Sequence, residues 1–63
     1  MTTKELAIQA LDIIKNHPNL ASEINDLFQL AKDEIEEGGS EDHECELALE
    51  SMHQLVTEKE DQS

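Results

Sequence analysis

The chain is short and strongly acidic: its 63 residues include sixteen acids and four lysines, which give a formal net charge of −12. This charge argues against direct binding to nucleic acid or to an anionic membrane surface, because like charges repel. A chain of this length forms one domain. Its core rarely contributes more than about 3–5 kcal/mol of folding stability without a disulfide, a metal or a partner subunit. No apolar run approaches the roughly 20 residues of a membrane span. The single cysteine cannot form an internal bridge, so we expect a cytoplasmic protein.

The first helix is expected to run to about Asn16. Thr2 and Glu5 have the spacing of a capping box, in which each side chain accepts a hydrogen bond from the other residue's amide. Apolar residues then recur at helical spacing on one face. This face comprises Leu6, Ala10, Ile13 and Ile14, with Ala7 at its edge. Ile8 lies nearly opposite this face.

A break follows at His17-Pro18-Asn19, because proline lacks an amide donor and disfavours helix in the residue before it. Two caps are compatible with this sequence. Either His17 caps a helix that starts at Pro18, or Asn19 caps a helix that starts at Leu20. In both cases the first two helices turn sharply against each other.

The second helix is expected from about Leu20 to Glu37. Its apolar stripe is the most regular in the chain and comprises Leu20, Ile24, Leu27, Phe28, Ala31 and Ile35. Phe28, the only aromatic residue, lies in the middle of this stripe, so we expect the core to depend on it. Leu30 lies outside the stripe.

The third helix is expected from about Glu41 to Thr57, after a corner at Gly38-Gly39-Ser40. Gly38 suits the left-handed position that ends a helix, and Ser40 suits the N-cap of the next one. The apolar face of this helix comprises Cys45, Ala48, Leu49, Met52, Leu55 and Val56, whereas Leu47 points the opposite way. The predicted fold is therefore all-α: three short helices in one domain over residues 1–57, the last two an antiparallel helical hairpin around Gly38-Gly39. Residues 58–63 are expected to form a frayed or disordered acidic tail.

The corner between the second and third helices has the highest density of acids, with eight in the fourteen residues from 33 to 46. These candidate partner-binding residues are Asp33, Glu34, Glu36, Glu37, Glu41, Asp42, Glu44 and Glu46. Acids three or four residues apart on a helix lie about 5–6 Å apart. Such a row of negative charges can mimic the phosphate backbone of a nucleic acid. In charge and size, though in no motif, the chain resembles small acidic decoys of phage or plasmid origin. This resemblance implies a non-enzymatic protein that inhibits or modulates a partner by masking its basic, nucleic-acid-binding surface.

A second hypothesis assigns binding to apolar rather than acidic residues. Ile8, Leu30 and Leu47 each lie on a different helix, and each lies outside the main apolar face of that helix. Three such residues in a chain with so small a core suggest a shared patch and a homodimer. On this hypothesis the protein is a dimeric helical adaptor and its charge is incidental.

A third hypothesis is a weak metal site on the third helix. Glu50 and His53 form an E-x-x-H pair, and His43 and Glu46 join them on one ridge. A solvated helix face is the favoured interpretation of this ridge. Cys45 lies on the apolar face and is expected to be a buried structural residue, without a nearby base to activate it. We therefore predict no catalytic residue and no cofactor.

Overall fold

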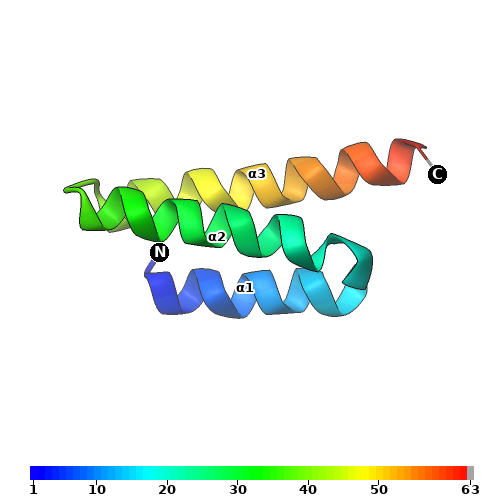
Figure 1. Ribbon diagram of the computed structural model, residues 1–63, viewed down its shortest axis with the longest axis horizontal. Helices are drawn as coiled ribbons and strands as arrows, with labels where there is room; N and C mark the ends of the chain where they lie inside the picture. The colour runs from blue at the N-terminus through cyan, green and yellow to red at the C-terminus, as the bar shows by residue number, and fades with distance from the viewer. Residues whose placement is uncertain (63) are drawn as a thin grey trace.

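Three helices make up the computed structural model, which describes the backbone of residues 1–62 and the side-chain surroundings of residues 1–60. They are α1 (Thr3–Asn16), α2 (Ala21–Glu36) and α3 (Glu41–Gln62), with a short 3-10 turn, η1 (Pro18–Leu20), between α1 and α2. The helices alternate in direction and lie side by side in a bundle of 38 × 17 × 17 Å (Figure 1). The predicted all-α fold, with α2 and α3 as an antiparallel hairpin, is confirmed.

The capping box predicted at the start of α1 is present. The Thr2 hydroxyl accepts from the Glu5 amide at 3.2 Å, and the Glu5 carboxylate accepts from the Thr2 amide at 3.3 Å. Each bond satisfies a donor that has no partner within the helix. The helix ends at Asn16, as expected before proline.

The corner between α1 and α2 has neither of the two predicted side-chain caps. Pro18 instead opens the turn η1, in which the Leu20 amide donates to the His17 carbonyl at 2.9 Å. A capping side chain bonds the second or third amide of its helix, and here the Leu20 amide is satisfied by the His17 carbonyl instead. Leu20 is buried, and α2 begins one residue later than expected, at Ala21.

The corner between α2 and α3 is a glycine-dependent Schellman motif. The Gly39 amide donates to the Glu34 carbonyl at 2.9 Å, and the Gly38 amide donates to the Ile35 carbonyl at 3.1 Å. Gly38 has a φ of 110°, as predicted for a left-handed helix end. A Cβ atom on Gly39 would lie 2.8 Å from the Glu34 carbonyl oxygen, so this position also requires glycine. The hydrogen bond of the predicted Ser40 cap is long, since the Ser40 hydroxyl lies 3.5 Å from the His43 amide.

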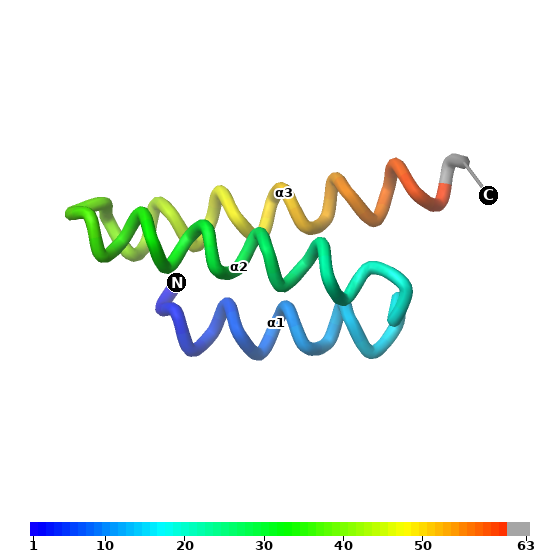
Figure 2. The backbone as a smooth tube through the Cα atoms, viewed as in Figure 1, coloured from blue at the N-terminus to red at the C-terminus, as the bar shows by residue number. Residues whose placement is uncertain are grey.

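The end of α3 differs from the expectation. The helix continues to Gln62 rather than ending near Thr57. Figure 2 shows the coloured tube continuing as a helix beyond Thr57. No glycine or proline follows Thr57, and glutamate, lysine and glutamine favour helix. The His17 ring lies 3.8 Å from the Glu60 carboxylate, which places this part of α3 beside the α1–α2 corner. Ser63 lies outside the described residues.

The core confirms the predicted apolar faces but corrects the role of Phe28. The largest fully buried side chains are Leu6, Ile24, Met52 and Cys45. Phe28 is only partly buried and packs at the margin of this core, where the Lys32 ammonium lies 5.8 Å from the centre of its ring. The buried line of α2 runs through Ile24 and Ala31, and these positions leave residue 28 on the flank of the helix.

The left-handed conformation of Gly38 predicts that a side chain at this position destabilises the protein. Gly38→Ala should lower the free energy of unfolding by about 1–2 kcal/mol, because alanine resists the left-handed conformation and no atom lies near enough to clash. Gly38→Asn should lose less, since asparagine tolerates this region better. Urea denaturation of the three proteins would measure both differences. Equal stability of the alanine variant would contradict the backbone assignment.

The core predicts that Ile24→Ala is more damaging than Phe28→Ala. Removing a fully buried isoleucine side chain costs about 2–5 kcal/mol, which approaches the entire stability of a domain this small. The Phe28 ring is partly solvated, so its removal leaves a smaller cavity and the variant should remain folded. Thermal melting followed by circular dichroism would compare them. A lower melting temperature for Phe28→Ala than for Ile24→Ala would show that Phe28 contributes more to the core than Ile24.

Candidate functional site

The acidic corner, defined as the eight acids between residues 33 and 46, lies at one end of the α2–α3 hairpin (Figure 1). Seven of its side chains are exposed, and that of Glu44 is half-buried. Glu36 and Glu37 lie at the C-terminal end of α2, where the helix dipole disfavours negative charge, whereas Glu41, Asp42 and Glu44 lie in the favourable first turn of α3. The structure therefore brings all eight predicted acids to one end of the molecule.

Two of these acids have a role that sequence reasoning missed, because they hold the start of α1 against the start of α3. The Glu41 carboxylate accepts from the Thr3 amide at 2.8 Å and from the Thr3 hydroxyl at 2.9 Å. The Asp42 carboxylate accepts from the Met1 amine at 2.6 Å. These contacts join residues about forty positions apart, and no local pattern in the sequence indicates them. We call this group the N-terminal clasp.

The clasp shifts the ionisation of the groups that form it. The hydrogen bond from the Thr3 amide, and then that from its hydroxyl, hold the pKa of Glu41 below its ordinary value of 4.5. The bond from the Met1 amine lowers the pKa of Asp42, and the same contact raises the pKa of the amine. Each charged form is thus favoured by folding, so the clasp is strongest between the acidic and alkaline limits.

Most of the remaining acids in the corner form no hydrogen bond or ion pair within residues 1–60. The Asp33 carboxylate accepts from the Gln29 side chain at 3.3 Å. Within residues 1–60, the Met1 amine pairs with the Asp42 carboxylate and the His17 ring lies 3.8 Å from the Glu60 carboxylate, and neither contact involves a lysine. No hydrogen bond or ion pair within this part of the chain occupies the carboxylates of Glu34, Glu36, Glu37, Glu44 and Glu46. These five carboxylates are therefore available to an external cation.

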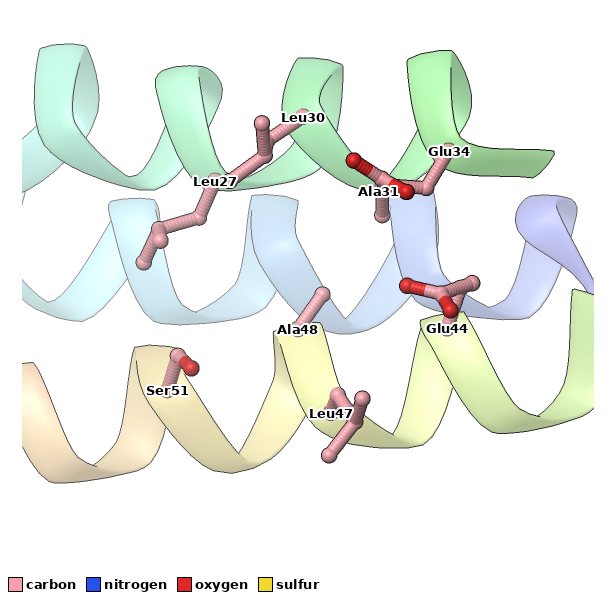
Figure 3. Close-up of a pocket in the computed structure, with 8 residues that line it drawn as sticks. All are labelled: Leu27, Leu30, Ala31, Glu34, Glu44, Leu47, Ala48 and Ser51. Carbon is pink, nitrogen blue, oxygen red and sulfur yellow. The ribbon is translucent and has the colours of Figure 1, made fainter. Parts of the chain in front are cut away.

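The three apolar residues predicted to form one patch lie in two places. Leu30 of α2 and Leu47 of α3 line the same groove between these helices, with α1 behind it (Figure 3). Ile8 lies elsewhere, in a hollow along α1 that it shares with Leu11. All three are exposed, but the structure separates Ile8 from the other two because helical spacing does not fix how helices are rotated against one another. Within one chain, Leu30 and Leu47 therefore share a groove that Ile8 does not line, and an oligomer interface through these residues stays a prediction.

The histidine and glutamate ridge does not form a compact metal site. His43, Glu46, Glu50 and His53 are all exposed on α3. His43 and His53 are ten residues apart, which separates them by about 15 Å along the helix. His53 instead lines a hollow with His17 at the end of α1. Among the described residues, no group of three or more histidines, cysteines and acids is placed to hold a metal ion.

Cys45 is fully buried, as expected for a structural residue. Burial raises the pKa of its thiol, which disfavours the reactive thiolate form. In the part of the chain that the structure describes, no helix combines the length and apolar character needed to cross a membrane.

Comparison of the chain with protein families, with characterised proteins and with solved structures found no match. The candidate site is therefore interpreted from its geometry and charge alone.

The N-terminal clasp predicts a stability difference that depends on pH. Glu41 has a lowered pKa in the folded state, so the stability from its charge is present above its ordinary pKa of 4.5 and is lost as the pH falls through the folded value. Glu41→Gln should therefore melt at a lower temperature than the unmodified protein at pH 7. The difference should shrink as the pH is lowered toward 3.

Glu37→Gln is the matched control, since Glu37 is also exposed and its carboxylate forms no hydrogen bond or ion pair with α1. Its melting temperature at pH 7 should stay the same or rise slightly, because the substitution removes a charge that the α2 dipole disfavours. A difference between Glu41→Gln and the unmodified protein that persists unchanged to pH 3 would show that the charge of Glu41 does not strengthen the clasp.

Proposed function

We propose that this chain is a non-enzymatic binding protein that covers a basic surface of a larger protein and so modulates or inhibits it. The observation that carries the proposal is the set of five carboxylates in the acidic corner that no hydrogen bond or ion pair within residues 1–60 occupies. Acids gathered at one exposed end create a field that attracts a basic partner and speeds association. A surface that normally binds nucleic acid has the complementary charge, so the chain would act there as a nucleic-acid mimic.

The composition and the single cysteine support the same proposal. The chain has no arginine and only four lysines, so its own cations cannot neutralise the acids, and direct contact with nucleic acid is disfavoured. Cys45 is free and buried, which suits a reducing compartment such as the cytoplasm.

The alternative function is that of an adaptor that binds through apolar residues. The observation that favours it is the groove between α2 and α3, where Leu30 and Leu47 are 58% and 46% exposed. Dimerisation through this surface stays a prediction. Salt separates the two functions, because an interaction dominated by charge weakens steeply as salt rises, whereas apolar contact does not.

The proposal predicts that acids of the corner act collectively. A combined Asp33→Asn, Glu36→Gln, Glu37→Gln variant should bind a captured partner roughly tenfold more weakly, mainly through slower association, because each exposed pair contributes only about 0.2–1 kcal/mol. The partner would be captured from the native host at low salt and eluted at high salt, and association rates would be measured with the purified partner. Glu41 and Asp42 are left unchanged, since they form the N-terminal clasp.

The matched control removes the same number of charges elsewhere. Asp12→Asn, Asp26→Asn, Glu50→Gln neutralises three exposed acids outside the corner. It should retain most of the affinity, losing only the general contribution of net charge. Equal losses in the two variants would show that net charge alone drives binding. Undiminished binding by the corner variant would leave the apolar adaptor as the better function.

A further inference from the structure

A continuous groove runs between α2 and α3, on the face of the hairpin away from α1 (Figure 3). One hollow has a volume of about 280 Å³, and a second hollow of about 270 Å³ follows it along the same two helices. Leu27 and Ser51 line both hollows, which makes them parts of one groove. The two hollows follow one another along the helices and are open to solvent, unlike the pockets that enclose a small molecule. The groove is therefore suited to an extended segment of a macromolecule.

The middle of this groove is apolar. Leu30 rises from α2 and Leu47 from α3, and both remain exposed while the alanines between them, Ala31 and Ala48, are buried (Figure 3). Small side chains at the base and large ones at the sides leave a furrow between two antiparallel helices. A third helix can pack into such a furrow by inserting its own apolar side chains between the two rows.

Both ends of the groove carry paired carboxylates. Glu34 of α2 and Glu44 of α3 line one end (Figure 3). Glu23 of α2 and Glu58 of α3 line the other. Along α2, Glu23 and Glu34 are separated by about 16 Å, or three helical turns. No lysine lines either hollow.

We infer that the groove between α2 and α3 binds an amphipathic α-helix of the basic partner. The apolar stripe of that helix contacts Leu30 and Leu47, and its basic residues, about three turns apart, pair with the carboxylates at the two ends. This inference rests on the proposed function, because the proposed function supplies the basic partner. The inference adds which element of that partner the chain recognises. It also gives the apolar and the acidic residues a shared role.

A second copy of this chain fits the groove less well. A two-fold symmetric contact places the same surface of each copy against the other. Because both ends of the groove carry carboxylate pairs, either relative orientation of the copies sets acids against acids. A helix with basic residues near both ends has no such repulsion.

The test uses designed 18-residue peptides as probes. The first peptide has leucines at helical spacing on one face and lysines eleven residues apart at its ends. The second has the same composition with the leucine stripe scrambled, and the third replaces the lysines with glutamates. Binding to the full chain would be measured by calorimetry, and the contact surface would be mapped by nuclear magnetic resonance. The first peptide should bind at least about tenfold more tightly than the other two.

Two matched variants locate the contact. A Leu30→Ser, Leu47→Ser variant should lose at least about tenfold in affinity for the first peptide, because it removes two apolar contacts. An Ile8→Ser, Leu11→Ser variant should bind unchanged, although Ile8 and Leu11 are 58% and 66% exposed, because both lie in the hollow along α1. Circular dichroism would confirm that both variants keep their helices, as expected for exposed positions.

The remaining outcomes each overturn the inference in a distinct way. No binding of the first peptide at millimolar concentration, or equal binding of the scrambled peptide, would exclude a helix in the groove while leaving the basic-surface proposal intact. Equal binding of the glutamate peptide would exclude the basic ends. If the unmodified chain sediments as a dimer and the Leu30→Ser, Leu47→Ser variant as a monomer, the groove belongs to a second copy. Failure of the proposed function itself would instead appear as undiminished partner binding by the variant at residues 33, 36 and 37.

Discussion

The structure depends on burying a very small set of apolar side chains where three helices meet. Leu6 of α1, Ile24 of α2 and Met52 of α3 are fully buried in a single core, and alanines such as Ala10 and Ala31 let the helices approach closely. A core of this size leaves little margin against the entropy of the unfolded chain. Each corner must therefore hold its helices in the register that this burial requires. The glycine motif between α2 and α3 and the proline turn between α1 and α2 supply that restraint.

Charge opposes this compact state and at one place supports it. A net charge of −12 on 63 residues produces self-repulsion, which is greatest where the acids gather at the hairpin corner. At the same corner, Glu41 and Asp42 secure the start of α1 through the N-terminal clasp. The acidic corner thus combines carboxylates that stabilise the fold with carboxylates that no internal hydrogen bond or ion pair occupies. This division shows which acids can be changed to study binding without disturbing the fold.

The groove between α2 and α3 links the two hypotheses that the sequence kept apart. The sequence alone assigns the apolar and the acidic residues to competing functions, an adaptor and a masking protein. In the folded chain, Leu30 and Leu47 lie between carboxylate pairs, so one basic amphipathic helix could contact both kinds of residue. Binding of this kind would derive much of its affinity from the leucines and its association rate from the carboxylates.

Sequence periodicity by itself determined the three helices, their buried faces and the left-handed glycine at residue 38. These features are local, because a helix face repeats every three or four residues and a cap involves near neighbours. The density of acids around Gly38-Gly39 likewise predicted an acidic corner. It did not show that α3 continues past Thr57, since several good helix formers without a stop signal permit either outcome.

Only the tertiary structure decided how the helices are rotated against one another. That rotation placed Phe28 at the margin of the core, joined Thr3 to Glu41, brought Leu30 beside Leu47 and left Ile8 on another surface. Each outcome depends on pairs of residues far apart in the chain. The spacing of apolar residues says which side of a helix is buried but not which neighbour covers its edges, because that depends on the packing of all three helices at once.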